Sequence, residues 1–159
     1  MNVIVLVPAR MASSRFPGKP MKKINGVPMI EMIYNNLVSL NNTYDLAIAT
    51  CDKIIDDHIT SIGGVAIMTS MDHDRASDRC AEALDKLEIK NNIKYDIVVM
   101  VQGDEPLIKV DDVELSISAL IDNENNKVVN LIEKIRSEEE FNDHNTIKCV
   151  FDKEYNALY

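Results

Sequence analysis

The sequence predicts a three-layer α/β fold, in which helices cover both faces of a mainly parallel sheet. Short β-branched runs that are apolar at odd and even positions alike recur along the 159 residues, as in strands buried on both faces. Helical patterns lie between several of these runs, and strands that alternate with helices form right-handed βαβ units. We therefore expect one α/β domain over residues 1–159.

The first expected strand, at residues 3–7, precedes the segment PARMASSRFPGKP. The further strands are expected at residues 46–49, 65–68, 97–101, 128–131 and 147–151. A helix is expected at 28–40, where apolar residues recur at helical spacing after a proline suited to a first helical turn. Other helices are expected at about 52–61, 76–90 and 111–122. The acidic segment 137–140 resembles a helix start, with Ser137 as its cap.

Composition narrows the class of protein. The net charge of −9 argues against a general nucleic-acid binder, which needs clustered Lys and Arg. No apolar run approaches the roughly 20 residues that span a bilayer, and no basic region precedes the apolar N-terminus, so we expect a cytoplasmic protein without a membrane segment. Cys51, Cys80 and Cys149 are widely spaced, which favours reduced structural thiols.

The segment 8–20 has the residues of a phosphate site. It follows the first strand, and ligands of open α/β sheets bind beyond the carboxyl ends of the strands. Arg10, Arg15 and Lys19 supply cations, while the small residues at 12–14 let backbone N–H groups approach an anion. Neither GxxxxGK[ST] nor GxGxxG is present, so a P-loop and a dinucleotide fingerprint are excluded. The alternative is a solvated basic loop.

A second candidate site follows the expected strand at 97–101. The sequence VVMVQGDEP places Asp104 and Glu105 after Gly103, and one or two carboxylates suffice for Mg²⁺ when phosphate oxygens complete its shell. The alternative is that the two acids cap the next helix or face water. If the strands are parallel, this loop and the segment 8–20 meet at one sheet edge, as a metal–nucleoside-triphosphate site requires.

Four blocks of the sequence resemble the 3-deoxy-manno-octulosonate cytidylyltransferases, the CMP-Kdo synthetases. They are VPARMASSRFPGKPMKKINGVPMI, TSMDHDRASDRCAEAL, VQGDEPLI and NTIKCVFDKEYNALY, in the order and spacing of that family. The resemblance covers essentially the whole chain. It implies a Rossmann-like fold of the GT-A type and a nucleotidyltransferase domain that binds CTP and Mg²⁺. The anomeric hydroxyl of Kdo would attack the α-phosphorus, giving CMP-Kdo and pyrophosphate for lipopolysaccharide or capsule synthesis.

The resemblance also implies roles for individual residues. Arg10, Lys19 and Asp104 would be catalytic, with Asp104 as the ligand of Mg²⁺. Phosphoryl-type transfer depends on positioning and charge stabilisation, so no covalent nucleophile from the protein is expected. The substrate-binding residues would be Pro8, Ala9, Arg10, Ser13, Ser14, Arg15, Lys19, Thr69, His73, Ser77, Asp78, Arg79, Gln102 and Gly103.

Two features depart from the family pattern. Arg75 and Ala76 stand where the family usually has Ser-Gly in a loop that lines its nucleotide pocket, so the base or sugar preference could differ. We interpret His73 as a hydrogen-bonding structural residue, with a general base as the alternative. We also expect the chain to lack the carboxyl-terminal part of the family, which supplies a second metal-binding aspartate and most of the dimer interface of a full-length homodimer.

Three functions therefore stay open. The first is a CTP-dependent Kdo transferase or its amino-terminal part. The second is a related nucleotidyltransferase that uses another sugar acid or nucleotide. The third is a nucleotide-binding module that is inactive because the chain stops early.

Overall fold

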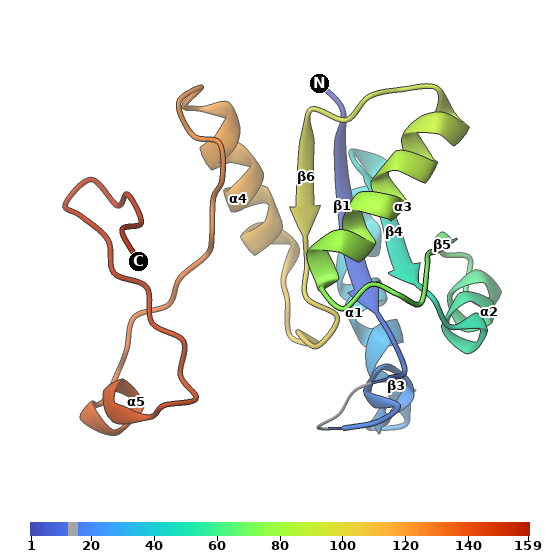
Figure 1. The fold of residues 1–159 in the computed structure, drawn as a ribbon, viewed down its shortest axis with the longest axis horizontal. Coiled ribbons are helices and arrows are strands. Elements are labelled where there is room, and N and C mark those ends of the chain that lie inside the picture. Colours follow the sequence, from blue (N-terminus) through green and yellow to red (C-terminus); the bar gives the residue numbers. More distant parts are fainter. Residues whose placement is uncertain (13–15) are drawn as a thin grey trace.

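A parallel four-stranded sheet forms the centre of the computed structural model, which describes residues 1–12 and 16–159. The strand order is β5-β4-β1-β6, and every pairing is parallel, which confirms the predicted sheet (Figure 1). The strands are β1 (Val3–Ala9), β4 (Asp45–Thr50), β5 (Ala66–Met68) and β6 (Ile97–Met100). Because these strands are parallel, the loops after β1 and β6 leave the same edge of the sheet.

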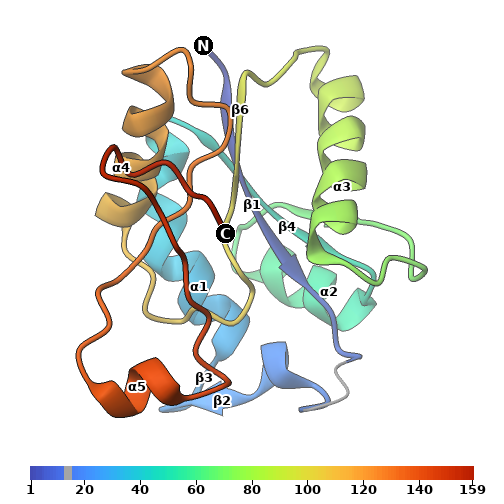
Figure 2. The ribbon, with the colours of Figure 1, turned by 60° about the vertical axis from the view of Figure 1, so that its left-hand side comes forward.

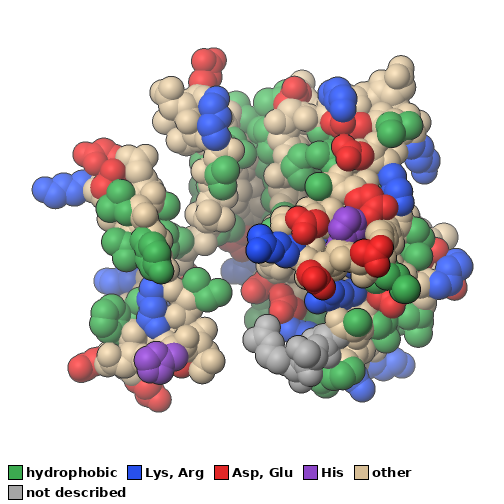
Figure 3. Space-filling model, in the orientation of Figure 1, with side chains coloured by type: hydrophobic (Ala, Val, Ile, Leu, Met, Phe, Trp, Pro, Cys, Tyr) green, Lys and Arg blue, Asp and Glu red, His purple; other side chains and the backbone are tan. Residues whose placement is uncertain are grey.

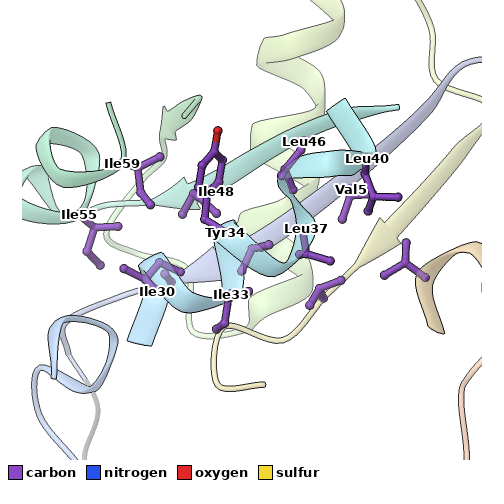
Figure 4. Close-up of a cluster of buried hydrophobic side chains, with 14 of the residues drawn as sticks. Val5, Ile30, Ile33, Tyr34, Leu37, Leu40, Leu46, Ile48, Ile55 and Ile59 are labelled. Carbon is purple, nitrogen blue, oxygen red and sulfur yellow. The ribbon is translucent and has the colours of Figure 1, made fainter. Parts of the chain in front are cut away.

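Helices cover both faces of the sheet, as predicted. Helices α1 (Met29–Leu37), α2 (Lys53–Ser61) and α4 (Val110–Ile121) pack on the odd-numbered side chains of β1, and α3 (Ala76–Asn91) packs on the even-numbered ones. All seven residues of β1 are buried, because successive side chains of a central strand enter opposite cores. Figure 4 shows the larger core, with side chains of α1 and α2 facing Val5 and Ile48.

Short elements connect the layers. A 3-10 turn, η1 (Lys19–Met21), and a small hairpin of β2 (Lys23–Ile24) and β3 (Val27–Pro28) lead into α1. A second 3-10 segment, η2 (Val38–Asn42), continues α1 to the start of β4. The loop between β1 and η1 thus has regular structure on both sides.

The last part of the chain differs from the prediction. Residues 128–131 and 147–151 form no strand, except that Phe151 makes an isolated bridge to Ala157. Val128 is 78% exposed and Ile147 96% exposed. An apolar run becomes a strand only when a partner strand accepts its backbone hydrogen bonds, and within the described residues nothing pairs with the outer edge of β6. The strand predictions for both segments were therefore wrong.

Residues 122–159 run as a separate arm beside α4 and the β6 edge (Figures 1 and 2). Its one helix is α5 (Glu138–Asn142), where Ser137 Oγ accepts a hydrogen bond from the Glu140 N–H at 3.0 Å, so the predicted cap is confirmed. Across the described residues, none of the helices combines the length and apolarity required to cross a bilayer.

Candidate nucleotide site

A polar cleft of about 360 Å³ opens at the carboxyl ends of β1 and β6. Three segments line it: the loop after β1, the turn before α3 and the loop after β6. In Figure 3, basic, acidic and histidine side chains intermingle on the face where α3 lies in front. The residues that line the cleft are Pro8, Ala9, Arg10, Ala12, Lys19, Pro20, His73, Asp74, Arg75, Ala76, Arg79, Gln102, Gly103 and Asp104.

The loop after β1 is held from both ends. The Met11 N–H donates to Asp52 Oδ2 at 2.7 Å, and the Met11 carbonyl accepts from the Gly18 N–H at 2.9 Å. Gly18 has a positive φ of 73°, a conformation that glycine adopts without steric cost, and it turns the chain into η1. This turn brings Lys19 back to the cleft. The predicted ligands Ser13, Ser14 and Arg15 lie outside the described residues.

Gly103 allows the loop after β6 to approach β1. A Cβ at this position would lie 2.1 Å from the carbonyl oxygen of Pro8, so only glycine fits. The close approach brings Asp104 to Lys19, and Asp104 Oδ2 lies 2.7 Å from Lys19 Nζ. The Lys19 and Asp104 side chains are 35% and 49% exposed, so both remain accessible to a ligand.

The turn before α3, residues 70–75, forms the third wall of the cleft, and a buried arginine holds it in place. Arg79 is 2% exposed, and its Nη1 donates to Thr69 Oγ1 at 2.5 Å and to the Ser70 carbonyl at 3.1 Å. The His73 carbonyl accepts from Arg79 Nη2 at 3.5 Å and from Arg10 Nη1 at 3.2 Å. Three segments therefore meet at one carbonyl oxygen.

The side chain of His73 has a hydrogen-bond partner on α3. Its Nε2 lies 2.5 Å from Glu82 Oε2. A neighbouring carboxylate thus engages the ring, and the structural role of His73 stays a prediction.

Three of the predicted ligands that the structure describes, Thr69, Ser77 and Asp78, do not line the cleft. Ser77 and Asp78 lie exposed in the first turn of α3, where Ser77 Oγ lies 3.4 Å from Asp78 Oδ1. Thr69 is buried beneath the cleft and reaches it through Arg79. Conversely, Pro20 and Asp74 line the cleft although sequence reasoning did not select them. Asp74 is adjacent to His73 in the sequence, and this adjacency could have identified Asp74 as a residue of the cleft.

The thiols in the sheet region do not supply a nucleophile near neutral pH. Burial raises the pKa of Cys80 to about 11, and burial also raises the pKa of Cys51. Cys80 lies at the start of α3 inside the smaller core. Since thiolates rather than thiols attack, neither cysteine is expected to act as a nucleophile. Cys80 contributes to the packing of the smaller core.

The cleft suits a magnesium ion that arrives with phosphate. No three His, Cys, Asp or Glu side chains of residues 1–12 and 16–159 are grouped to hold a metal alone. Asp104 nevertheless presents a half-exposed carboxylate among Lys19 and Arg10. Mg²⁺ typically uses one or two carboxylates and completes its octahedron with water and substrate phosphates. The donor set therefore fits a metal–nucleotide complex.

The chain is similar to known cytidylyltransferases. The family model described as Cytidylyltransferase matches residues 4–159. The chain is 42% identical to the 3-deoxy-manno-octulosonate cytidylyltransferase of Thermodesulfovibrio yellowstonii, and 41% identical to the 8-amino-3,8-dideoxy-manno-octulosonate cytidylyltransferase of Shewanella piezotolerans. These matches cover the whole chain but 63% and 64% of the two relatives.

A solved structure has the same fold. It is a CMP:2-keto-3-deoxy-manno-octonic acid synthetase complexed with CTP, which superimposes with a TM-score of 0.87 at 33% identity. The match covers all of this chain and 63% of the solved one, so the chain spans less than two thirds of the length of these relatives. Since the family model covers nearly all of the sequence, the chain belongs to the cytidylyltransferase family.

Proposed function

We propose that this chain carries the nucleotide-binding part of a cytidylyltransferase that activates Kdo with CTP, giving CMP-Kdo and pyrophosphate. The observation that carries the proposal is the convergence of Arg10, Lys19 and Asp104 in one cleft, within a chain whose relatives are named for this activity. The product would serve lipopolysaccharide or capsule synthesis in the cytoplasm, and the full-length form would be a homodimer.

The reaction would need positioning and charge stabilisation from the protein. The hydroxyl oxygen of the sugar attacks the α-phosphorus of CTP, the bond from that phosphorus to the bridging oxygen of pyrophosphate breaks, and the hydroxyl proton passes to solvent. Arg10 and Lys19 would neutralise the triphosphate and the departing pyrophosphate, together with Arg15. Gln102, exposed at the cleft, would contact the sugar.

Asp104 would hold Mg²⁺, and the ion would offset the negative charge of the triphosphate. In that role the Asp104 carboxylate leaves its ion pair with Lys19, and the Lys19 ammonium becomes available to phosphate. The exposed position of both side chains makes this exchange sterically simple.

A second function is favoured by the residues at the third wall. Arg75 and Ala76 line the cleft, and a guanidinium there adds a charged donor facing the ligand. Another nucleotide or sugar acid would then be the preferred substrate. Competition calorimetry with CTP, UTP and GTP separates the two functions, because tighter binding of UTP or GTP would overturn the preference for CTP.

The test of the leading function is pyrophosphate release from CTP, Mg²⁺ and Kdo by this chain. We expect Asp104→Ala to abolish release, while the neighbouring variant Glu105→Ala retains it, because Glu105 lies outside the lining of the cleft. Magnesium-dependent CTP binding without release would identify an inactive nucleotide-binding module instead. Absence of CTP binding would contradict the proposal.

A further inference from the structure

Glu82 lies on α3 outside the cleft, and its carboxylate binds the turn that forms the third wall. Glu82 Oε2 accepts from the Ser70 N–H at 2.8 Å and lies 2.5 Å from His73 Nε2. Its other oxygen, Oε1, pairs with Lys86 Nζ at 2.7 Å, one helical turn further along α3. The Glu82 side chain is 26% exposed, so the carboxylate is partly shielded from solvent.

Glu82 and Arg79 hold opposite polar groups of the same turn. The Ser70 N–H donates to Glu82, whereas the Ser70 carbonyl accepts from Arg79 Nη1 at 3.1 Å. At His73 the ring contacts Glu82 and the carbonyl accepts from Arg79 Nη2. Both side chains project from adjacent turns of a helix that is packed on the sheet, so the turn is fixed to a rigid element.

The turn 70–73 also contacts Arg10, a residue that lines the cleft. The His73 carbonyl also accepts a hydrogen bond from Arg10 Nη1 at 3.2 Å. Arg10 belongs to the loop after β1, and its guanidinium lines the cleft. The His73 carbonyl therefore holds the Arg10 guanidinium. Arg79 binds this carbonyl directly, and Glu82 restrains the same turn through the Ser70 N–H and the His73 ring.

We propose that Glu82 is a positioning residue of the nucleotide site, which fixes the turn 70–73 so that the His73 carbonyl orients Arg10 toward the triphosphate. This inference rests on the proposed function, because it assigns the role to binding of CTP. The ionised carboxylate is the required form, since it accepts all three hydrogen bonds. Hydrogen bonds from Lys86, Ser70 and His73 lower the pKa of Glu82 to about 2, so this form prevails at neutral pH.

Another glutamate of α3 provides a matched control. Glu88 Oε1 accepts from the Tyr95 N–H at 3.0 Å, and Glu88 Oε2 pairs with Lys94 Nζ. Glu88 thus also attaches a backbone N–H and a lysine to α3, but its contacts are with the segment that follows α3 and not with the turn 70–73. Loss of either carboxylate removes comparable contacts, whereas loss of Glu82 alone affects the orientation of Arg10.

The experiment measures Mg²⁺–CTP binding by calorimetry in the whole chain and in Glu82→Ala, Glu82→Gln and Glu88→Ala. We expect Glu82→Ala to raise the Kd by roughly tenfold, the factor that corresponds to one lost hydrogen bond to a charged group. Glu82→Gln keeps a carbonyl that can accept from the Ser70 N–H, so its Kd should lie between those of wild type and Glu82→Ala. Glu88→Ala should bind CTP as the wild type does.

A second readout does not depend on the nucleotide. Hydrogen exchange of the Ser70 amide in the ligand-free protein should be faster in Glu82→Ala and unchanged in Glu88→Ala. If Glu82→Ala fails to fold, the same comparison of exchange and Kd is made with Glu82→Gln.

The outcomes separate the two claims. If wild type binds CTP and folded Glu82→Ala has the same Kd, the positioning role is overturned and the proposed function stands. If Glu82→Ala does not fold, an unchanged Kd in Glu82→Gln has the same meaning. An equal loss of affinity in Glu82→Ala and Glu88→Ala also overturns the positioning role, because the effect would then be general destabilisation. No CTP binding by wild type overturns the proposed function and the positioning role together, even if the exchange of Ser70 responds.

Discussion

Lys19 Nζ lies 2.7 Å from Asp104 Oδ2, across 85 residues of sequence. The cation proposed for the triphosphate and the carboxylate proposed for Mg²⁺ thus neutralise each other in the ligand-free cleft. An exposed ion pair of this kind contributes about 0–1 kcal/mol to stability. Its separation on binding therefore costs little, and each group gains a more highly charged partner in the metal–nucleotide complex.

Replacement of Lys19 by Ala should change binding far more than folding. We expect the free energy of unfolding to fall by no more than about 1 kcal/mol, because the pair is exposed. The Kd for CTP should rise by at least tenfold, because loss of a charged contact to phosphate corresponds to about 1.5–3 kcal/mol. Calorimetry and urea unfolding measure the two quantities. Lys23→Ala, on the exposed hairpin, is the control and should leave both unchanged.

Gly103→Ala should damage both stability and the site. The added Cβ would lie 2.1 Å from the Pro8 carbonyl oxygen, so the two loops must move apart. We expect a loss of about 1–3 kcal/mol in urea unfolding, as in overpacked sites, and weaker CTP binding. Gly63→Ala is the control: no heavy atom lies within 4 Å of its Cβ, and its φ of 82° adds only backbone strain of about 1 kcal/mol. If Gly103→Ala binds CTP with the Kd of wild type, the loop after β6 does not form part of the nucleotide site.

Thr69→Val should destabilise the buried arginine. Valine has nearly the shape of threonine but removes the oxygen that accepts from Arg79 Nη1 at 2.5 Å and the hydroxyl that donates to the Thr50 carbonyl. A buried donor left without its acceptor costs about 1–3 kcal/mol. Thr60→Val on the exposed side of α2 is the matched control. Equal unfolding free energies of the two variants would show that the Arg79 contact adds nothing to stability.

The stability added by Glu82 should depend on pH. Its pKa falls from an ordinary 4.5 to about 2 in the folded protein, so the ionised carboxylate stabilises the fold. For a lowered pKa, this contribution is complete above the unfolded value and is lost as pH falls through the folded value. The difference in unfolding free energy between wild type and Glu82→Gln should be constant above about pH 5 and shrink toward pH 2. A difference that does not change with pH would mean that Glu82 is not stabilised as an anion.

Local sequence patterns were sufficient to predict the sheet and the location of the cleft. The uninterrupted apolar runs at β1 and β4 are buried on both faces of a parallel sheet between helix layers, as predicted. The run at β6 also joins this sheet, but as an edge strand, with Val98 and Met100 each 40% exposed. The rule that ligands bind beyond the carboxyl ends of parallel strands then predicted that Arg10, Lys19 and Asp104 lie together.

Tertiary structure decided what depends on a partner distant in sequence. Residues 128–131 have the composition of a strand, but no described strand accepts their hydrogen bonds, so they stay irregular. The contact of His73 with Glu82 and the pair of Lys19 with Asp104 depend on how a helix and two loops are placed against one another. By itself the sequence determined the four strands of the sheet, the helices α1 to α4 and the chemical groups of the cleft, because these follow from local periodicity and residue type. The folded chain decided which groups pair, because hydrogen bonds and ion pairs form only over a few ångströms.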